Sequence, residues 1–486
     1  MIHEPFPPFL LIGNRRVEGT ESFPVRNPYD GREVGRASVA TGSQVAAALD
    51  GAWRARPSLA PAERAELLER VARHYEENAA EAAALLTAEA GICLRQARHE
   101  VARSVHALRG AAHQARVLAD EDREAPYRVP GEVPAAELEV VAEPVDLAVA
   151  ITPFNHPLNQ VVHKVAPALA AGACLVLKPS EKTPLSALRF AEVLIEQGLP
   201  EHMLNVVTGR PAAAVVQALV THPGVEVVSF TGSVEVGRSI ARTMAAAGNE
   251  LVRLVPELGG NAAFVVMDDA DLPAAARIAL GAFDNAGQRC TAIKRILVHE
   301  AVADDFLDLF LAESRRLRCG DPWDPETDLG PVIDEPAAVE IERRVEDALR
   351  SGARLLLGHR RCGALYPPTV LDRVTPGMEL VRRETFGPVA PVLRVRSLEE
   401  CIAIVQSGRY RLAGAIATAS EETARRYAEA VQVGQLSWNG PPGYRTESAP
   451  FGGFGDSGNG AKEGIVHATR SLLRLRTFYR HPRKGA

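Results

Sequence analysis

The sequence has no hydrophobic run long enough to cross a bilayer. Its longest apolar stretch, Val165–Leu177, contains Pro167 and Gly172, whereas a membrane-spanning helix needs about 20 apolar residues. The first residues carry no small-residue cleavage pattern, so no secretory signal peptide is expected. These features argue against a membrane protein and favour a cytoplasmic one.

Cysteine and excess positive charge are also scarce. None of the six cysteines lies in a CxxC pair or another metal-ligand spacing, which predicts free thiols in a reducing compartment and no metal site. The 55 Lys and Arg residues are outnumbered by 61 Asp and Glu residues, so no nucleic-acid partner is expected. With 46% hydrophobic and 24% charged residues over 486 positions, the composition is that of a globular protein with a large core.

A regular alternation of apolar strands and helices begins near residue 145. Before it, apolar residues at three- and four-residue spacing predict helices over 61–88 and 95–119, followed by a loop and β-ribbon over 121–143. The alternation that follows indicates a parallel sheet covered by helices on both faces. The predicted strands lie in VDLAVAIT, ACLVLKPS, MLNVVTG, VEVVSFTG and LVRLVPELGG, and the predicted helices span 158–171, 185–197, 212–220 and 235–247.

A second α/β segment is expected over about 261–431. It contains a predicted helix at 272–286, a strand at 295–299 and a helix at 302–318. Near the end, SLLRLRTFYR has the pattern of a strand. A terminal strand beside an early ribbon predicts pairing between subunits, and therefore a homo-oligomer.

Each strand of the first sheet ends in a polar or glycine-containing cluster. Ligands of open α/β sheets bind at the carboxyl ends of the strands, so we expect these clusters to converge. They lie at 152–155, 178–181, 208–209, 231–233 and 257–259.

Three residues near these clusters are candidates for chemistry. Cys290 follows Arg289, which would favour a thiolate, whereas the other cysteines are expected to be small buried hydrophobes. Glu257 ends a strand and is either a structural cap or a base whose pKa is raised by burial. Asn155 lies in a turn enforced by Pro157, where its amide either satisfies the turn or stabilises an oxyanion.

Two turns are candidates for ligand binding. The turn FTGSVEVG places Gly232 and Ser233 at a helix N-terminus, where free N–H groups can bind phosphate, although the GxGxxG pattern is missing. Lys178 and Glu181 flank a Pro-Ser turn, which is equally typical of a solvated surface.

In combination, these motifs resemble the aldehyde dehydrogenase family over nearly the whole chain. The strings PFNHP, LKPSEKTP, GLP, LNVVTG, FTGSVEVG, ELGGN, GQRCT, ETFGP and PFGG occur in the family's order. The resemblance implies an α/β aldehyde dehydrogenase-like fold that assembles into a homodimer or homotetramer. Its implied parts are a Rossmann-type NAD-binding domain (1–122 and 145–257), an α/β catalytic domain (258–432), and an oligomerisation ribbon with the C-terminal segment (123–144 and 433–486).

The resemblance also implies catalytic roles. Cys290 would attack the aldehyde carbon to give a thiohemiacetal, with the Asn155 amide and the Cys290 backbone N–H holding the oxyanion. Hydride transfer to NAD would leave a thioester, which water activated by Glu257 would hydrolyse to the free acid. Relatives that acylate CoA lack this base, so a hydrolytic, non-acylating reaction is expected.

A cofactor site follows from the same resemblance. Lys178 is expected at ribose hydroxyls, Ser233 at the pyrophosphate and Glu384 at the nicotinamide ribose. Glu181 would accept hydrogen bonds from the adenosine ribose and repel a 2′-phosphate, which favours NAD over NADP. The full implied set is Thr152, Pro153, Phe154, Lys178, Ser180, Glu181, Gly209, Phe230, Thr231, Gly232, Ser233, Val236, Leu258, Gly259, Glu384 and Phe386.

Four basic side chains are implied to line the substrate tunnel: Arg103, His156, Arg289 and Arg445. A lone arginine is usually a surface ion-pair partner, but several directed at one tunnel match a phosphonate, phosphate or carboxylate. Within the family, the His after Asn155 and the string PGYR resemble phosphonoacetaldehyde dehydrogenases, which predicts oxidation of phosphonoacetaldehyde to phosphonoacetate. Glyceraldehyde 3-phosphate and phosphonoformaldehyde stay open as substrates, as do a cofactor-free thiol hydrolase and a silent binding protein.

Some positions depart from the family pattern. Pro256, just before Glu257, removes a ladder hydrogen bond and puts the direction of the Glu257 side chain in doubt. The segment Trp438–Pro442 is an unusual entry to the Arg445 loop, and Gly455 replaces the usual Lys after PFGG. These departures concern the preferred substrate length more than the type of reaction.

Overall fold

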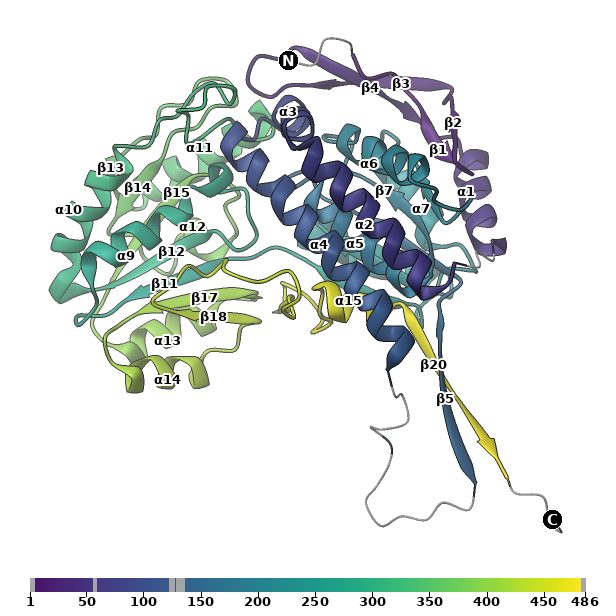
Figure 1. Cartoon of the computed structure of the whole chain (residues 1–486). Coiled ribbons are helices and arrows are strands. Elements are labelled where there is room, and N and C mark those ends of the chain that lie inside the picture. Colours follow the sequence, from purple (N-terminus) through teal and green to yellow (C-terminus); the bar gives the residue numbers. More distant parts are fainter. Residues whose placement is uncertain (1–4, 56–58, 122–126, 128–135, 482–486) are drawn as a thin grey trace.

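The computed structural model describes residues 5–55, 59–121, 127 and 136–481, and it contains two lobes built on separate sheets (Figure 1). Each sheet has seven strands. A two-stranded ribbon extends away from both lobes. The predictions that concern residues 1–4, most of the loop before the ribbon and residues 482–486 lie outside the described residues.

The first sheet has the strand order β10-β9-β6-β7-β8-β1-β2. Its first five strands are parallel, while β1 and β2 extend the edge in antiparallel fashion. The strands are β1 (Leu10–Ile12), β2 (Arg15–Val17), β6 (Leu147–Ile151), β7 (Cys174–Lys178), β8 (Leu204–Val206), β9 (Val227–Thr231) and β10 (Arg253–Glu257).

Helices bury both faces of this sheet. One core joins it to α2, α4, α5 and α6, and a second core joins the opposite face to α1, α7 and α8. The helices are α1 (Gly42–Arg54), α2 (Pro61–Glu77), α3 (Ala79–Ala90), α4 (Leu94–Asp120), α5 (Asn159–Ala171), α6 (Leu185–Glu196), α7 (Ala212–Val220) and α8 (Val234–Ala246).

The second sheet has the order β13-β14-β15-β12-β11-β17-β18 and is parallel except for β13. Its core strands are apolar on both faces because α9 and α10 cover one side and α11 to α14 the other. The elements are β11 (Ala262–Val266), α9 (Leu272–Ala279), β12 (Ile293–His299), α10 (Ala303–Ser314), α11 (Glu335–Arg350), β13 (Arg354–Leu357), β14 (Thr369–Asp372), α12 (Glu379–Arg382), β15 (Val389–Val395), α13 (Leu398–Ser407), β17 (Ala413–Ala417), α14 (Glu421–Ala430) and β18 (Gln435–Trp438).

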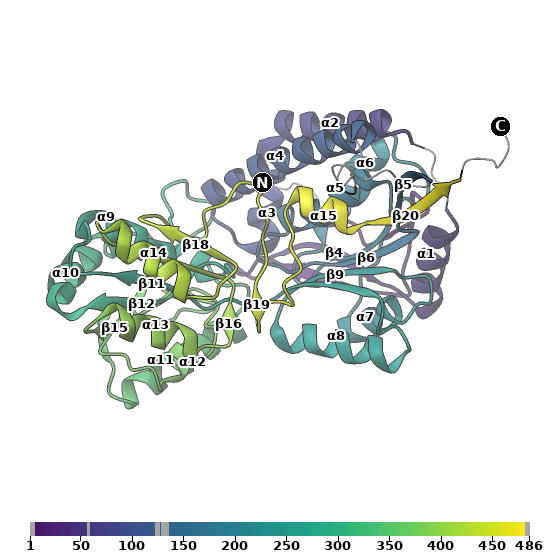
Figure 2. The ribbon, with the colours of Figure 1, turned by 90° about the horizontal axis from the view of Figure 1, so that it is seen from below.

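Smaller elements connect the lobes and form the ribbon. The C-terminal segment passes between the lobes, where β16 and β19 pair, and continues to α15 beside α4 and α5 (Figure 2). The ribbon pairs β5 with β20 along their full length within one chain. The remaining bounds are β3 (Glu21–Arg26), β4 (Glu33–Val39), β5 (Glu137–Pro144), β16 (Tyr410–Arg411), β19 (Phe454–Gly455), α15 (Ile465–Ser471) and β20 (Leu473–Arg480).

The predicted alternation of strands and helices in the first sheet agrees with the structure, whereas one predicted helix is divided and two are too long. The helix expected over 61–88 is divided at Asn78 into α2 and α3. The helix expected over 272–286 ends at Ala279, and the one expected over 302–318 ends at Ser314. The proposed domain boundaries stay a prediction.

Candidate active site

Cys290 lies at the end of an irregular turn between α9 and β12. Here the chain leaves the helical conformation, with φ of 52° at Asn285 and Ala286 and 71° at Gly287. Positive φ is strained for residues with a Cβ and is tolerated mainly where function or packing requires it. This turn explains why α9 ends before the predicted residue, and it brings Cys290 to the start of β12.

The buried side chain of Lys294 stabilises this turn through hydrogen bonds. Its side chain is 3% exposed, and its Nζ donates to the carbonyl of Gly287 at 3.2 Å and to that of Arg289 at 2.9 Å. Nζ also lies 3.8 Å from Oε1 of Glu384. One cation therefore connects the Cys290 turn to a predicted cofactor residue.

A cavity of about 310 Å³ opens in front of Cys290. It lies where the two lobes meet the C-terminal segment, and all seven residues predicted for catalysis and for the substrate anion line it. The lining residues are Arg103, Pro153, Phe154, Asn155, His156, Gln160, Thr231, Gly232, Ser233, Glu257, Leu258, Gly259, Arg289, Cys290, Thr291, Glu384, Phe386, Gly443, Arg445 and Phe451.

The Asn155 amide is fixed against the Cys290 turn. Its Nδ2 donates to the backbone carbonyl of Gln288 at 2.8 Å, and the backbone carbonyl of Asn155 accepts from Nδ2 of Asn285 at 2.9 Å. A primary amide has two N–H donors. One therefore orients the side chain, and the second is left for a ligand in the cavity.

Glu257 ends β10 and faces the cavity with little exposure, 1% of its surface. Neither carboxylate oxygen has a hydrogen-bond partner among the described residues. Burial raises its pKa well above the ordinary value, with repulsion from Glu463 adding to the effect and Arg445 opposing it. Pro256 is tolerated because β10 is an edge strand, where a missing N–H costs little.

The pKa of the Cys290 thiol differs from the sequence-based expectation. Burial and the nearby Glu257 carboxylate raise it well above its usual range. The influence of Arg289 expected from the sequence is not among the largest on this thiol. Arg445 is the guanidinium that most opposes the rise in its pKa.

The other cysteines are also not all alike. Cys93, Cys174 and Cys401 are buried as predicted, but Cys319 is only partly buried and Cys362 is exposed. The prediction of small buried hydrophobes is thus wrong for Cys362.

Most of the predicted cofactor residues lie along the carboxyl ends of β6 to β10, whereas Glu384 and Phe386 lie between α12 and β15 of the second lobe. Nine of them line the cavity, namely Pro153, Phe154, Thr231, Gly232, Ser233, Leu258, Gly259, Glu384 and Phe386. Thr152, Lys178, Ser180, Glu181, Gly209 and Phe230 lie at or just beyond the ends of the strands, and Val236 lies in the first turn of α8.

Lys178 is not part of a solvated surface turn. Its side chain is buried, its Nζ lies 3.7 Å from Oε2 of Glu181, and burial lowers its pKa. Ser233 caps α8 by accepting a hydrogen bond from the N–H of Val236 at 3.3 Å. The carboxyl ends of the strands therefore present the ammonium group of Lys178, the carboxylate of Glu181 and the N-terminus of α8.

Three of the four basic residues, Arg103, His156 and Arg289, have carboxylate partners that the sequence pattern did not reveal. Arg103 forms a two-pronged contact with Glu447, and His156 lies 3.0 Å from Glu100. Glu100 and Arg103 are three residues apart and so share one face of α4. This spacing could have indicated from the sequence that a carboxylate accompanies Arg103 at the tunnel. Glu447 follows Arg445 by two positions, but nothing in the sequence indicates that it turns toward α4.

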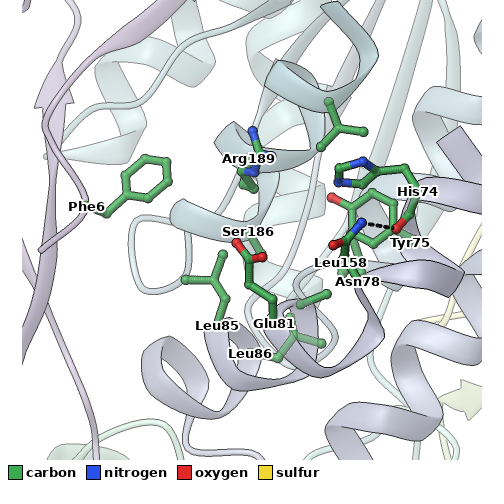
Figure 3. A pocket seen from close by; sticks show the side chains of 12 residues that line it. Phe6, His74, Tyr75, Asn78, Glu81, Leu85, Leu86, Leu158, Ser186 and Arg189 are labelled. Atoms are coloured by element: carbon green, nitrogen blue, oxygen red, sulfur yellow. Dashed lines mark hydrogen bonds between the residues drawn. The ribbon is translucent and has the colours of Figure 1, made fainter. Parts of the chain in front are cut away.

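A second cavity of about 130 Å³ lies between α2, α3, α6 and the N-terminal segment (Figure 3). Its walls are mostly apolar, and it contains none of the predicted site residues. Within the described ranges, no group of three or more His, Cys, Asp or Glu side chains could hold a metal ion. No helix of the described part is long and apolar enough to cross a membrane.

A family model described as the aldehyde dehydrogenase family matches residues 16–478. This chain belongs to the aldehyde dehydrogenase family. The predicted family and fold are thereby confirmed, including the Rossmann-type arrangement of the first sheet and the oxidoreductase class.

Curated relatives and solved structures cover nearly the whole chain. The chain is 35% identical to a sulfoacetaldehyde dehydrogenase of Neptuniibacter caesariensis, over 94% of this chain and 99% of the relative. It is 37% identical to a 3-sulfolactaldehyde dehydrogenase of Priestia aryabhattai, over 96% of each. The crystal structure of an NADP-dependent glyceraldehyde-3-phosphate dehydrogenase from Bacillus halodurans C-125, complexed with NADP, has a TM-score of 0.91 and 33% identity, covering 98% of this chain and 100% of that one.

Proposed function

We propose that this aldehyde dehydrogenase oxidises a small aldehyde with a tetrahedral oxyanion at its far end, and that it releases the free acid. The observation that carries this proposal is one cavity lined by a thiol, a buried carboxyl group, an anchored amide and four basic side chains. Phosphonoacetaldehyde is the candidate from the sequence, and sulfoacetaldehyde is the candidate from a relative's name.

Cys290, Asn155 and Glu257 have separate tasks in this proposal. The Cys290 thiolate attacks the aldehyde carbon, and the free N–H of the Asn155 amide stabilises the oxygen as negative charge develops. Glu257 then removes a proton from the water that attacks the thioester. Its raised pKa suits this task, because a base with a pKa closer to neutral removes a proton more readily than an ordinary carboxylate.

The residues at the ends of the strands fit a nicotinamide dinucleotide. The hydroxyl oxygen of Thr231 is buried without a partner, the N-terminus of α8 offers N–H groups beside Ser233, and a Cβ on Gly259 would collide with Glu384. When bound, the oxidised nicotinamide supplies the two-electron acceptor. We propose NAD because Glu181 is a carboxylate, which repels a 2′-phosphate. Glu384 would hold the nicotinamide ribose, kept in place by Lys294 and the N–H of Gly260.

The test measures cofactor reduction and product together. The enzyme should reduce NAD with sulfoacetaldehyde or phosphonoacetaldehyde at least tenfold more efficiently than with uncharged propionaldehyde, and it should release the acid whether or not CoA is present. The same assay with NADP should give a lower kcat/KM. Cys290→Ala should abolish turnover but still bind NAD, because the thiol is not a cofactor ligand.

Three outcomes would contradict parts of this proposal. A preference for propionaldehyde would contradict the proposed anion site, and an acyl-CoA product would contradict the hydrolytic role of Glu257. Ester cleavage by the wild type without any cofactor reduction would favour a thiol hydrolase.

A further inference from the structure

Glu447 neutralises one of the arginines at the far end of the cavity. Its Oε1 accepts from Nε of Arg103 at 2.6 Å and its Oε2 accepts from NH2 at 3.2 Å. The Nε2 of His163, on α5, also contacts Oε2 at 2.5 Å. Burial would raise the pKa of Glu447, but the hydrogen bonds from His163 and Arg103 hold it far below the ordinary value. Glu447 is therefore ionised near neutral pH and places a negative charge beside Arg103.

Two more of the basic side chains have their own carboxylates. Arg289 lies 3.2 Å from Asp284, whose side chain is 54% exposed. His156 contacts the buried carboxylate of Glu100, which also accepts the backbone N–H groups of Leu158 and Asn159 at 3.0 Å each. Burial lowers the pKa of His156 despite this contact, so its neutral form prevails near neutral pH.

Arg445 is different, since no carboxylate among the described residues lies within ion-pair distance of it. Its NH1 is buried without a hydrogen-bond partner, and its guanidinium lies over the ring of Phe451 at 3.9 Å. An unpaired donor of a guanidinium that lines the cavity is suited to receive an oxyanion.

The charges around the tail of the substrate therefore nearly cancel before the substrate binds. The three guanidinium groups, of Arg103, Arg289 and Arg445, equal in number the three carboxylates: Glu447 on Arg103, Asp284 on Arg289 and Glu100 on His156. Protonation of His156 can add one positive charge. A tail with one negative charge is balanced by this single proton, whereas a second negative charge has no partner in a partly desolvated site.

We propose that this cavity selects a singly charged tail, such as a sulfonate, over a doubly charged phosphonate or phosphate, and that Glu447 sets this selection. The inference rests on the proposed oxidation of anionic aldehydes. Glu447 acts as a positioning and charge-setting residue, because it contacts Arg103 and His163 and is absent from the cavity in front of Cys290, although it lines the adjoining cavity that shares Arg103, Arg289 and Arg445.

The experiment compares sulfoacetaldehyde with phosphonoacetaldehyde from pH 6 to pH 8.5. A sulfonate keeps one charge throughout, whereas a phosphonate loses its second proton near neutral pH, as a phosphate monoester does at about 6. The ratio of the kcat/KM values, sulfonate over phosphonate, should rise at least tenfold across this range. Taking the ratio cancels the titration of Cys290 and Glu257, which both substrates use.

Histidines that interact electrostatically with Arg103 do not cancel in this ratio. His99 on α4, His156 before α5 and His163 on α5 all have pKa values lowered by burial. Loss of a proton from any of them acts in the same direction, against the doubly charged tail. Variants at Glu447 separate their effect, because they leave all three histidines in place.

Glu447→Gln keeps the shape of the side chain and removes its charge. At pH 8.5 it should lower the sulfonate-to-phosphonate ratio at least tenfold, while Glu447→Asp should leave it nearer the wild-type value. Asp456→Asn is the matched control, because Asp456 is likewise a carboxylate held by basic side chains, Arg238 at 2.7 Å and Arg409 at 3.0 Å, but neither of these arginines lines the cavity. It should not change the ratio.

The outcomes separate this inference from the proposed function. Oxidation of both anionic substrates with a ratio that stays constant from pH 6 to pH 8.5 would overturn only the selection by charge. An unchanged ratio in folded Glu447→Gln would overturn the role of Glu447, and the wild-type pH series decides the selection even if that variant fails to fold. A preference for propionaldehyde over both would overturn the proposed function itself.

Discussion

Arg445 influences both ends of the cavity. At the reacting end it is the largest favourable influence on the ionised form of Cys290, opposing burial and the Glu257 carboxylate. It also opposes the rise in the pKa of Glu257. One guanidinium therefore bears on the nucleophile, the base and the tail of the substrate.

This position predicts how the reactivity of Cys290 depends on pH. Because its pKa is raised, the thiolate is a minor form near neutral pH, and alkylation should accelerate as the pH rises. Arg445→Met should move that rise to higher pH and slow alkylation at pH 7.5 by about threefold or more. The measurement is the rate of iodoacetamide labelling, in a Cys362→Ser background because Cys362 is exposed. Faster labelling in Arg445→Met would show that the guanidinium does not favour the thiolate.

At the scale of elements, the turn between α9 and β12 depends on Lys294. Removing its ammonium leaves the carbonyls of Gly287 and Arg289 without this donor and leaves Glu384 beside an apolar side chain. The turn already contains two non-glycine residues at positive φ, so it has little intrinsic preference for its native shape.

Lys294→Met should therefore lower kcat/KM at least tenfold and destabilise the fold by about 2 kcal/mol. Activity assays and thermal melting measure the two effects. Lys182→Met is the control, because Lys182 forms an exposed ion pair with Asp334, and its activity should stay near the wild-type level. Full activity in Lys294→Met would mean that the turn keeps its shape without the cation.

Sequence reasoning succeeded where one element follows a strong local rule. Buried strands with continuous apolar runs, such as Leu147–Ile151 and Cys174–Lys178, were placed to within a few residues, and three of the five polar clusters at the strand ends, at 152–155, 231–233 and 257–259, line one cavity. It failed where distant contacts decide: helix α9 ends early because the Cys290 turn must reach the cavity, and Glu447 pairs with Arg103 from 344 positions away. Counting positive charges in the sequence therefore overstated the charge of the anion site.

At the scale of the whole molecule, the β5–β20 ribbon has two unlike faces. Register places Leu475 opposite Ala142 and Tyr479 opposite Leu138, which makes one face apolar. On the other face Arg474 pairs with Glu143 and Phe478 with Glu139. Leu475 and Tyr479 are 61% and 57% exposed, and an exposed apolar sheet face commonly marks an interface.

We expect this apolar face to bury itself against another copy of the chain, in a homodimer or homotetramer. Leu475→Asp should shift the protein toward the monomer in size-exclusion chromatography with light scattering, since a buried carboxylate without a partner is costly. Phe478→Asp is the matched control, because Phe478 is equally apolar and 52% exposed on the opposite face of the same strand. Equal dissociation by both variants, or by neither, would contradict an interface through the apolar face.

The ribbon joins segments that lie more than 300 positions apart, since Arg480 pairs with Glu137. During translation both lobes can therefore condense while β5 still lacks its partner strand. If subunits associate through the ribbon, a nascent chain cannot recruit another copy in this way until residue 480 has left the ribosome. Subunits would then assemble only after both lobes have been synthesised, and polypeptides truncated before β20 would not enter the oligomer.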